Sequence, residues 1–195
     1  MAQGCLDGSA MSEIGCRNVE FFGGAIVCDL PHSLTDASQV RHVPDHQEVW
    51  VDSMTDSSLV CEILQKAGVK DSEAVKFFLA DLADSNDARS SAVVQSRRLG
   101  AEEVPYLPAE VACFSGLGEQ MIAKFKEVSA NKVEIHLCVI RLAEQETDIV
   151  VSFNSPSAID PESSSAGATL TVAPASVFEQ IIKSLRIVDW NLFDA

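Results

Sequence analysis

Residues 21–51 constrain the fold of this chain more than any other stretch. Two apolar, strand-like runs, FFGGAIVCDL and EVWV, flank a polar connector. Apolar runs of this kind, bounded by turn residues, are typical of β-strands. The connector is held at both ends by pieces of core, and its charged and turn-forming residues are Thr35, Asp36, Arg41, Pro44 and Asp45. We expect one strand over 21–30, kinked or bulged at the glycine pair 23–24, and a second over 47–52.

Residues 55–67 show the clearest helical pattern. Five apolar residues recur at the spacing of one helix face, namely Leu59, Val60, Ile63, Leu64 and Ala67. Thr55 or Asp56 is the expected N-cap, and Gly68 is expected to end the helix.

The segment VKFFLADL, residues 75–82, fits either a helix or a buried strand. A capping residue at Asp71 favours a helix, whereas the aromatic pair Phe77-Phe78 suits a pleated surface. We predict a short helix to about Lys76, followed by a strand.

The C-terminal half of the chain reads mainly as strands, over 92–98, 111–125, 133–142 and 148–154, with a polar hairpin turn at 144–147. Residues 155–173 hold two prolines, three successive serines and a glycine, which predicts a mobile loop. Pro174 lies near the start of a last helix, whose apolar face is Val177, Phe178, Ile181, Ile182 and Leu185. The tail after this helix is expected to pack Val188, Trp190 or Phe193 on the body.

This order of elements predicts a single α/β domain of the α+β kind. Sequential strands with helices early and late indicate one antiparallel sheet flanked by helices, an α/β/α sandwich, rather than a parallel βαβ repeat. The domain is expected over 18–195. Residues 1–17 are small and polar without periodicity, which predicts a disordered tail.

Charge and cysteine usage exclude several classes of protein. The 14 basic and 29 acidic residues give a net charge of −15, whereas a nucleic-acid binder needs a basic face. No apolar run approaches the roughly 20 residues that span a bilayer, and the first residues do not resemble a secretory signal. The six scattered cysteines indicate thiols in a reducing compartment, the cytoplasm or nucleus. We expect a monomer that binds a basic protein surface; acidity that serves only solubility is the alternative.

The sequence contains no motif of a catalytic or cofactor site. It has no G-x-x-x-x-G-K-[ST] phosphate loop, no G-x-S-x-G elbow, no H-E-x-x-H and no Cys/His set at zinc spacing. Gly116-x-Gly118 lies in a strand-like run, where it indicates a bulge rather than a phosphate loop. His42 and His46 flank Asp45 in a turn, and nothing in their spacing makes them converge. We expect no catalytic, metal-binding or cofactor-binding residue, and therefore no enzyme.

Six carboxylates and one basic residue, Arg41, lie in the connector and the expected helix after it. The acids are Asp36, Asp45, Glu48, Asp52, Asp56 and Glu62. Capping by Asp36 and Asp56 and turn closure by Asp45 account for several of them, and Arg41 can pair with one. Glu62 has no such local role in the middle of a helix. The residues alone leave two interpretations open, a solvated face and a docking site.

Four sequence blocks occur here in an order that is known from one family. The first, FGGA and then D-x-S-x-x-R-x-V-P-D-x-Q-E-V, matches Phe22, Gly23, Gly24, Ala25, Asp36, Ser38, Arg41, Val43, Pro44, Asp45, Gln47, Glu48 and Val49. The second, D-x-S-L-x-x-E-L-L, is similar to residues 56–64. The third matches Arg141, Leu142, Thr147, Asp148, Asn154 and Pro156, and the fourth matches Phe178, Glu179, Ser184, Leu185, Asp189, Leu192 and Phe193. Together they resemble the Mog-type Ran guanine nucleotide release factors of nuclear import.

The resemblance implies a single domain with a PsbP-like fold. Such a protein binds the small GTPase Ran, promotes release of its guanine nucleotide and supports nuclear import, in nucleus and cytoplasm. The resemblance implies that the family's docking acids lie on the helix matched by 55–67, where Glu62 corresponds to one acid and Gln65, three positions later, replaces a second. The Ran-binding residues are expected to be Asp36, Arg41, Asp45, Glu48, Asp56, Glu62 and Gln65. The alternative is a ligand-binding or assembly module on a PsbP-like scaffold, without a GTPase partner.

Overall fold

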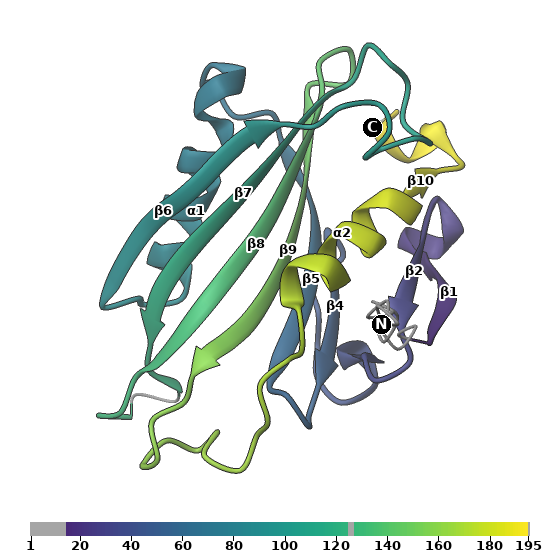
Figure 1. The fold of residues 1–195 in the computed structure, drawn as a ribbon. Coiled ribbons are helices and arrows are strands. Elements are labelled where there is room, and N and C mark those ends of the chain that lie inside the picture. Colours follow the sequence, from purple (N-terminus) through teal and green to yellow (C-terminus); the bar gives the residue numbers. More distant parts are fainter. Residues whose placement is uncertain (1–14, 125–126, 195) are drawn as a thin grey trace, which may run out of the picture.

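A seven-stranded antiparallel sheet forms the centre of the computed structural model (Figure 1), which describes residues 15–124 and 127–194. Its strand order is β3-β4-β5-β9-β8-β7-β6. The strands are β3 (Thr35–Asp36), β4 (Gln47–Asp52), β5 (Ser57–Gln65), β6 (Ser90–Arg98), β7 (Ala112–Ile122), β8 (Asn131–Leu142) and β9 (Thr147–Ala158). The strand expected over 47–52 and the four expected in the C-terminal half are therefore confirmed, with shifts of a few residues at their ends.

A second sheet, with the strand order β1-β2-β10, lies beside the first. Its strands are β1 (Cys16–Phe21), β2 (Ile26–Pro31) and β10 (Arg186–Ile187). The single strand expected over 21–30 is wrong, because β1 and β2 form an antiparallel hairpin. Gly23 and Gly24 adopt φ angles of 67° and 94°, so the glycine pair reverses the chain instead of kinking one strand.

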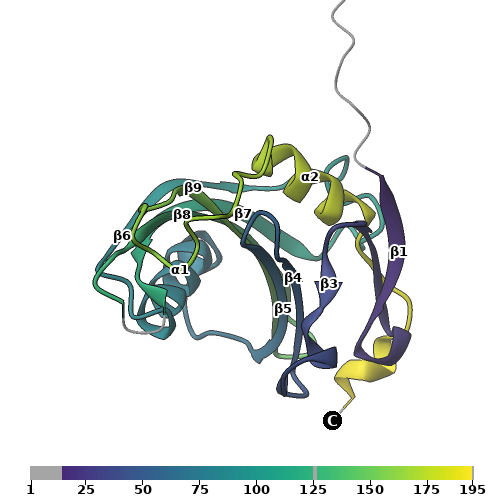
Figure 2. The same ribbon diagram turned by 90° about the horizontal axis from the view of Figure 1, so that it is seen from below.

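The two helices cover opposite faces of the large sheet (Figure 2). Helix α1 (Ala74–Ser85) packs on β6, β7 and β8. Helix α2 (Pro174–Ser184) and the small sheet cover the other face, and the expected apolar face of α2 is buried there. The expected single domain, an antiparallel sheet flanked by helices, is confirmed. Two residues of the C-terminal tail, Trp190 and Phe193, pack on this core as expected, whereas Val188 is 58 % exposed.

The expected N-terminal tail lies mostly outside the described residues, which exclude 1–14. Strand β1 begins at Cys16, two residues before the expected domain boundary. Arg17 is anchored there, because its guanidinium donates to the carbonyl oxygens of His32 at 2.9 Å and Leu34 at 2.6 Å.

Gly116 and Gly118 on β7 allow α1 to pack closely on the sheet. A methyl group at Gly116 would overlap Val75, and one at Gly118 would lie 2.8 Å from Leu79 Cδ2. The expected bulge lies on the neighbouring strand, where the β6–β7 register shifts between Val93 and Gln95. The two glycines therefore allow close packing of the helix, and they lie on strand β7 rather than in a phosphate-binding loop.

The helix expected over 55–67 is wrong, because strand β5 occupies this segment. Leu59 and Cys61 face the core under α2, whereas Leu64 packs in the core under α1. Apolar contacts on both faces remove the alternation that identifies a strand, and the remaining pattern imitates a helix face. Asp56 is not a helix cap; it adopts φ of 57° in the turn between β4 and β5.

The strand expected from Phe77 is also wrong, because residues 74–85 form one helix. Val75, Phe78 and Leu79 face the sheet at helical spacing, while Phe77 is 43 % exposed. The aromatic pair favours a strand by propensity, but packing of one helical face against the glycines of β7 outweighs that preference.

The expected mobile loop over 155–173 begins later, because β9 continues to Ala158. Residues 159–173 contain turns and no strand or helix, and they are tied to the rest of the fold. Thr169 N–H donates to the Met54 carbonyl at 2.9 Å, and the hydroxyls of Ser57 and Thr171 lie 2.7 Å apart. These contacts hold the loop against the β4–β5 turn.

Arg141 forms a buried ion pair within the β8–β9 hairpin and also binds the segment between β5 and α1. Arg141 Nε donates to Asp148 Oδ1 at 3.1 Å, and their side chains are 1 % and 0 % exposed. The same guanidinium donates to the carbonyl oxygens of Ala67 at 2.6 Å and Val69 at 2.9 Å. Arg141 and Asp148, two residues of the third sequence block, therefore stabilise the fold and are not exposed for binding a partner.

Candidate functional site

Strands β4 and β5 present one face that α1 does not cover. The residues of this face are Gln47, Val49 and Val51 on β4, which lie directly opposite Glu62, Val60 and Ser58 on β5. The intervening Leu59 and Cys61 point into the core under α2, and side chains alternate between the faces of a strand. Because α1 packs on β6 to β8, a cavity of about 550 Å³ lies over this part of the sheet. We call these six residues the open face.

Glu62 stands at one end of the open face. Gln47 Nε2 donates a hydrogen bond of 2.5 Å to Glu62 Oε1. A neutral amide satisfies part of the carboxylate's hydrogen-bonding capacity, but it leaves the negative charge uncompensated. Within the described residues no cation forms an ion pair with Glu62.

Asp45 lies in the turn before β4, and Arg41 lies at the cavity. Asp45 is exposed in the turn closed by the Gln47 N–H, and the backbone bond from Ile63 N–H to the His46 carbonyl, 2.9 Å long, holds this turn beside β5. Arg41 is exposed and lines the cavity. Across the described part of the chain, neither residue forms an ion pair, so the pairing of Arg41 with an acid is not observed.

Glu48 and Asp36 belong to the fold more than to the open face. Glu48 points to the opposite side of β4, where its carboxylate accepts a 2.6 Å hydrogen bond from the Phe22 N–H. Burial raises the pKa of Glu48, the bond from Phe22 opposes this rise, and the charge of Asp36 adds to it. Asp36 itself accepts from the Ser38 N–H at 2.8 Å, so its predicted capping role is confirmed, on a 3₁₀ turn over 37–39.

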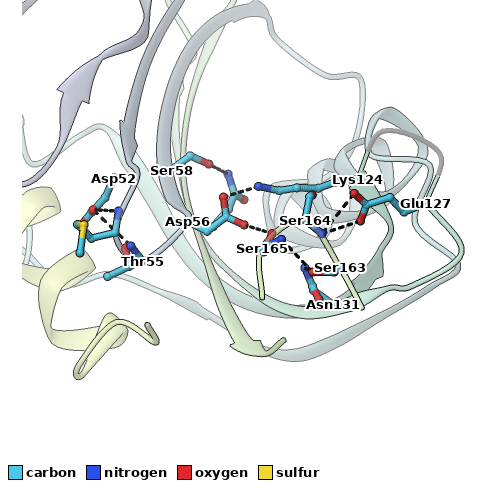
Figure 3. A network of polar contacts seen from close by, with 12 residues as sticks. Asp52, Thr55, Asp56, Ser58, Lys124, Glu127, Asn131, Ser163, Ser164 and Ser165 are labelled. Atoms are coloured by element: carbon cyan, nitrogen blue, oxygen red, sulfur yellow. Dashed lines mark hydrogen bonds and ion pairs between the residues drawn. The ribbon is translucent and has the colours of Figure 1, made fainter. Parts of the chain in front are cut away.

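Asp56 is engaged inside the molecule, as Figure 3 shows. Its carboxylate forms an ion pair with Lys124 and accepts a 2.6 Å hydrogen bond from the Ser165 hydroxyl. The loop is held further where Ser164 N–H donates to Glu127 at 3.1 Å. Asp56 therefore joins the β4–β5 turn to two other loops, and its charge is compensated.

Gln65 and Glu62 do not share a surface. They are three positions apart on a strand, so their side chains point to opposite faces of β5. Gln65 is exposed at the end of β5, opposite Thr147. The sequence comparison placed both residues on one helix, and the strand separates them.

The structure therefore brings Glu62 and Gln47 into contact, and it separates Asp56, Glu48 and Gln65 from them. Two contacts were not foreseen from the sequence, Gln47 to Glu62 and Lys124 to Asp56. The first follows from strand register, which a helix assignment hides. The second joins residues 68 apart in the chain, and no local pattern signals it.

No group of three or more His, Cys, Asp or Glu side chains that could hold a metal occurs among the described residues. Cys28, Cys61, Cys113 and Cys138 are buried thiols, and burial raises the pKa of each, to about 12 for Cys113. None of the helices in 15–124 and 127–194 is long and apolar enough to cross a membrane. The open face, with its uncompensated carboxylate, is the candidate site.

Known proteins resemble this chain over most of its length. The family model described as "Ran-interacting Mog1 protein" matches residues 19–156. A Danio rerio protein named Ran guanine nucleotide release factor is 36 % identical over 179 residues, which cover 88 % of this chain and 97 % of the relative. A Schizosaccharomyces pombe protein named Nuclear import protein mog1 is 30 % identical over 191 residues, covering 90 % and 99 % of the two chains.

Solved structures agree with these relatives. The Saccharomyces cerevisiae Ran-binding protein Mog1p has a TM-score of 0.69 and 27 % identity, covering 93 % of this chain and all of that one (100 %). A PsbP from Synechocystis, with a TM-score of 0.55 and 10 % identity over 94 % and 98 % of the two chains, shares the fold alone, which confirms the expected PsbP-like architecture. The match of the family model over 19–156 and the identity to the relatives show that this chain belongs to the Mog1 family.

Proposed function

We propose that this chain binds the small GTPase Ran, promotes release of its guanine nucleotide and supports nuclear protein import. The names of the relatives and the description of the family model support this function. The relatives named as nuclear import proteins support a place for the chain in nucleus and cytoplasm. It acts as a monomeric regulator that performs no covalent chemistry.

The observation that carries the proposal is the Glu62 carboxylate on the open face. It is a partly exposed negative charge that forms no ion pair among the described residues, and it stands at the end of the open face whose Val49, Val51, Ser58 and Val60 line the cavity. A carboxylate in this setting gains more from a cationic partner surface than one that is already neutralised. We assign the docking surface to the open face, from Glu62 to the cavity that Arg41 lines.

Nucleotide release requires a difference in affinity. A partner shifts the equilibrium only if it binds empty GTPase better than loaded GTPase. Carboxylates near the phosphate or magnesium site repel bound phosphate and compete for the basic groups that hold it. The net charge of −15 also steers approach to a basic surface, so the association rate should fall as salt rises.

The test is release of fluorescently labelled GDP and GTP from purified Ran at stoichiometric amounts of this protein. We expect faster release than from Ran alone. No acceleration with either nucleotide would contradict the proposal. An unbiased pull-down separates it from the scaffold-module alternative, which predicts recovery of membrane or photosynthetic components instead of Ran.

A further inference from the structure

Helix α2 leaves part of the sheet face over β6, β7 and β8 uncovered (Figure 1). Two adjoining hollows of about 260 and 150 Å³ lie there, between α2 and the strands. They share four lining residues, Arg97, Ser115, Phe178 and Glu179, and so form one continuous groove. We call it the α2 groove. It lies on the side of the sheet opposite the open face.

The floor of the α2 groove is apolar. It is formed by Leu99, Leu117, Cys138, Phe178 and Ile182. Burial raises the pKa of the Cys138 thiol well above its usual range, so this sulfur stays neutral and adds to the apolar surface. A floor of this kind favours the apolar body of a ligand.

One carboxylate at the centre of the groove has no partner. Arg97 is neutralised by Glu103, whose two oxygens accept from it at 2.9 and 2.6 Å. Glu179 lies at the junction of the two hollows and makes no hydrogen bond or ion pair with any described residue, including Lys183 one turn further along α2. Three carboxylates (Glu102, Glu103 and Glu179) and two cations (Arg97 and Lys183) line the groove, so its charge balance is negative.

A buried imidazole lies beside this carboxylate. His136 is 6 % exposed, and its Nε2 has no hydrogen-bond partner in the described chain, although Glu134 Oε2 lies 3.5 Å away. Burial lowers the pKa of His136 and so favours the neutral ring, while the charge of Glu134, its hydrogen bonding and the charge of Glu179 oppose that shift. The Phe178 ring lies 6.0 Å from the imidazole between their centroids. Carboxylate, neutral nitrogen and aromatic face all suit an N–H⁺ group.

We propose that the α2 groove binds a small organic cation with an apolar body, such as an arylalkylamine. Its ammonium group lies between Glu179 and His136, against Phe178, and its apolar body covers the floor towards Leu99 and Ile182. The net charge of −15 favours cations near this surface. This activity is independent of GTPase binding, because the groove and the open face lie on opposite sides of the sheet.

The test compares three probes with the same apolar body by NMR titration of the full chain: 4-phenylbutylamine, 4-phenylbutanol and 5-phenylpentanoate. We expect the amine to bind roughly tenfold more tightly than the other two. Shifts should centre on Gly116, Phe178 and the His136 ring. Glu179→Gln should bring the affinity for the amine down to that for the alcohol and leave the alcohol unchanged.

The matched control is Glu20→Gln, which removes an exposed carboxylate on the outer face of β1 and should change neither affinity. Glu179 is exposed, so its variant is expected to fold, and its amide spectrum verifies this. The proposal is overturned if the three probes bind equally, if the shifts map away from the groove, or if Glu179→Gln keeps the preference for the amine.

Discussion

Strand β5 has an acid near each end, and the two acids have opposite environments. Asp56, in the turn before the strand, is held by the Lys124 ammonium and the Ser165 hydroxyl. Among the residues that the structure describes, Glu62 forms a hydrogen bond with the neutral amide of Gln47 and no ion pair. The two lie six residues apart, about 20 Å along an extended chain. Both belong to one sequence block, yet only Glu62 keeps a charge that a partner can neutralise.

This difference separates acids that build the fold from acids that are available at the surface. A compensated carboxylate has already gained its interaction energy within the molecule, and a partner must first displace its cation. An uncompensated carboxylate costs the fold little and offers its full charge to a partner. Whether an acid is available to a partner therefore depends on the contacts of its carboxylate more than on the sign and number of charges in its segment.

The largest effect is expected at the most compensated acid, Asp148. Its Asn substitution keeps the shape but leaves the Arg141 guanidinium buried with one counter-charge fewer, which should cost about 3 kcal/mol of unfolding free energy. Urea denaturation monitored by tryptophan fluorescence measures this loss. The control is Asp71→Asn, which removes the 55 % exposed partner of the same Arg141 and should cost less than about 1 kcal/mol. Equal losses in the two variants would show that burial does not distinguish these acids.

The opposite pattern is expected at Glu62. Glu62→Lys should lower Ran affinity about thirtyfold, equivalent to about 2 kcal/mol, because it places like charges together at the docking surface. The free energy of unfolding should change by less than about 1 kcal/mol, since the side chain is partly exposed and has no cationic partner. Fluorescence anisotropy with labelled Ran measures binding, and denaturation measures stability.

Glu20→Lys is the matched control for this charge reversal. Glu20 is an exposed strand acid on the small sheet, and its reversal makes the same change in net charge. It should reduce affinity only through long-range steering, by less than about threefold at physiological salt. If both variants lose affinity equally, net charge rather than the open face governs binding.

The compensated end of β5 should respond to Lys124→Met. The change leaves the Asp56 carboxylate, 23 % exposed, without its cation and should cost about 1 kcal/mol of stability. Hydrogen exchange should rise over 163–165, while Ran affinity stays within about twofold. Lys132→Met removes the more exposed pair with Glu119 and serves as the control. A fall in affinity like that of Glu62→Lys would extend the docking surface to the Asp56 end.

The layers and the later elements followed from the sequence, but the β1–β2 hairpin, strand β5 and the full length of α1 did not. In the last helix and the later strands the apolar residues recur with a single clear period, so the sequence pattern predicted these elements. The residues around Leu59 pack on both faces of a central strand, and that pattern is compatible with a helix. In α1 the aromatic pair at Phe77 misled in the opposite direction. Local patterns fail where tertiary packing determines the environment of a segment.

The candidate site was predicted by residue type but not by geometry. Glu62 was singled out because it lacked a local partner, and the structure preserves this feature through a different element. Lys124 neutralises Asp56 across 68 residues, and no sequence spacing reveals such a contact. The capping of Asp36, by contrast, lies within three residues and was predicted correctly.

The environment of Glu48 is intermediate between those of Asp56 and Glu62, because its carboxylate is partly buried and accepts a backbone hydrogen bond but has no ion pair among the described residues. The pH dependence of stability tests this. Burial raises its pKa in the folded protein above the unfolded value, while the Phe22 bond partly opposes the rise and Asp36 adds to it. Ionised Glu48 therefore disfavours folding at neutral pH, and this penalty disappears as pH falls through the folded pKa to the unfolded one. Glu48→Gln should be slightly more stable than the parent at pH 7 and equal to it near pH 4. Denaturation curves at both pH values measure this, and a loss of stability at pH 7 would show that the bond to Phe22 outweighs burial.

The smallest effect is expected at Gln65, where the family's second acid is replaced. On a helix, Gln65→Glu would place a second charge beside Glu62 and strengthen binding. On β5 the two side chains point to opposite faces, so a partner on the open face gains only a distant charge. We expect Ran affinity to rise by less than about twofold, and stability to stay within about 0.5 kcal/mol because Gln65 is exposed. Anisotropy titrations of the single variant and of Gln65→Glu with Glu62→Gln measure the coupling between the positions. The β4–β5 pairs end at Glu62, so β4 does not cover the edge of β5 at Gln65. A gain of tenfold or more would therefore mean that Ran contacts both faces of β5 around this edge.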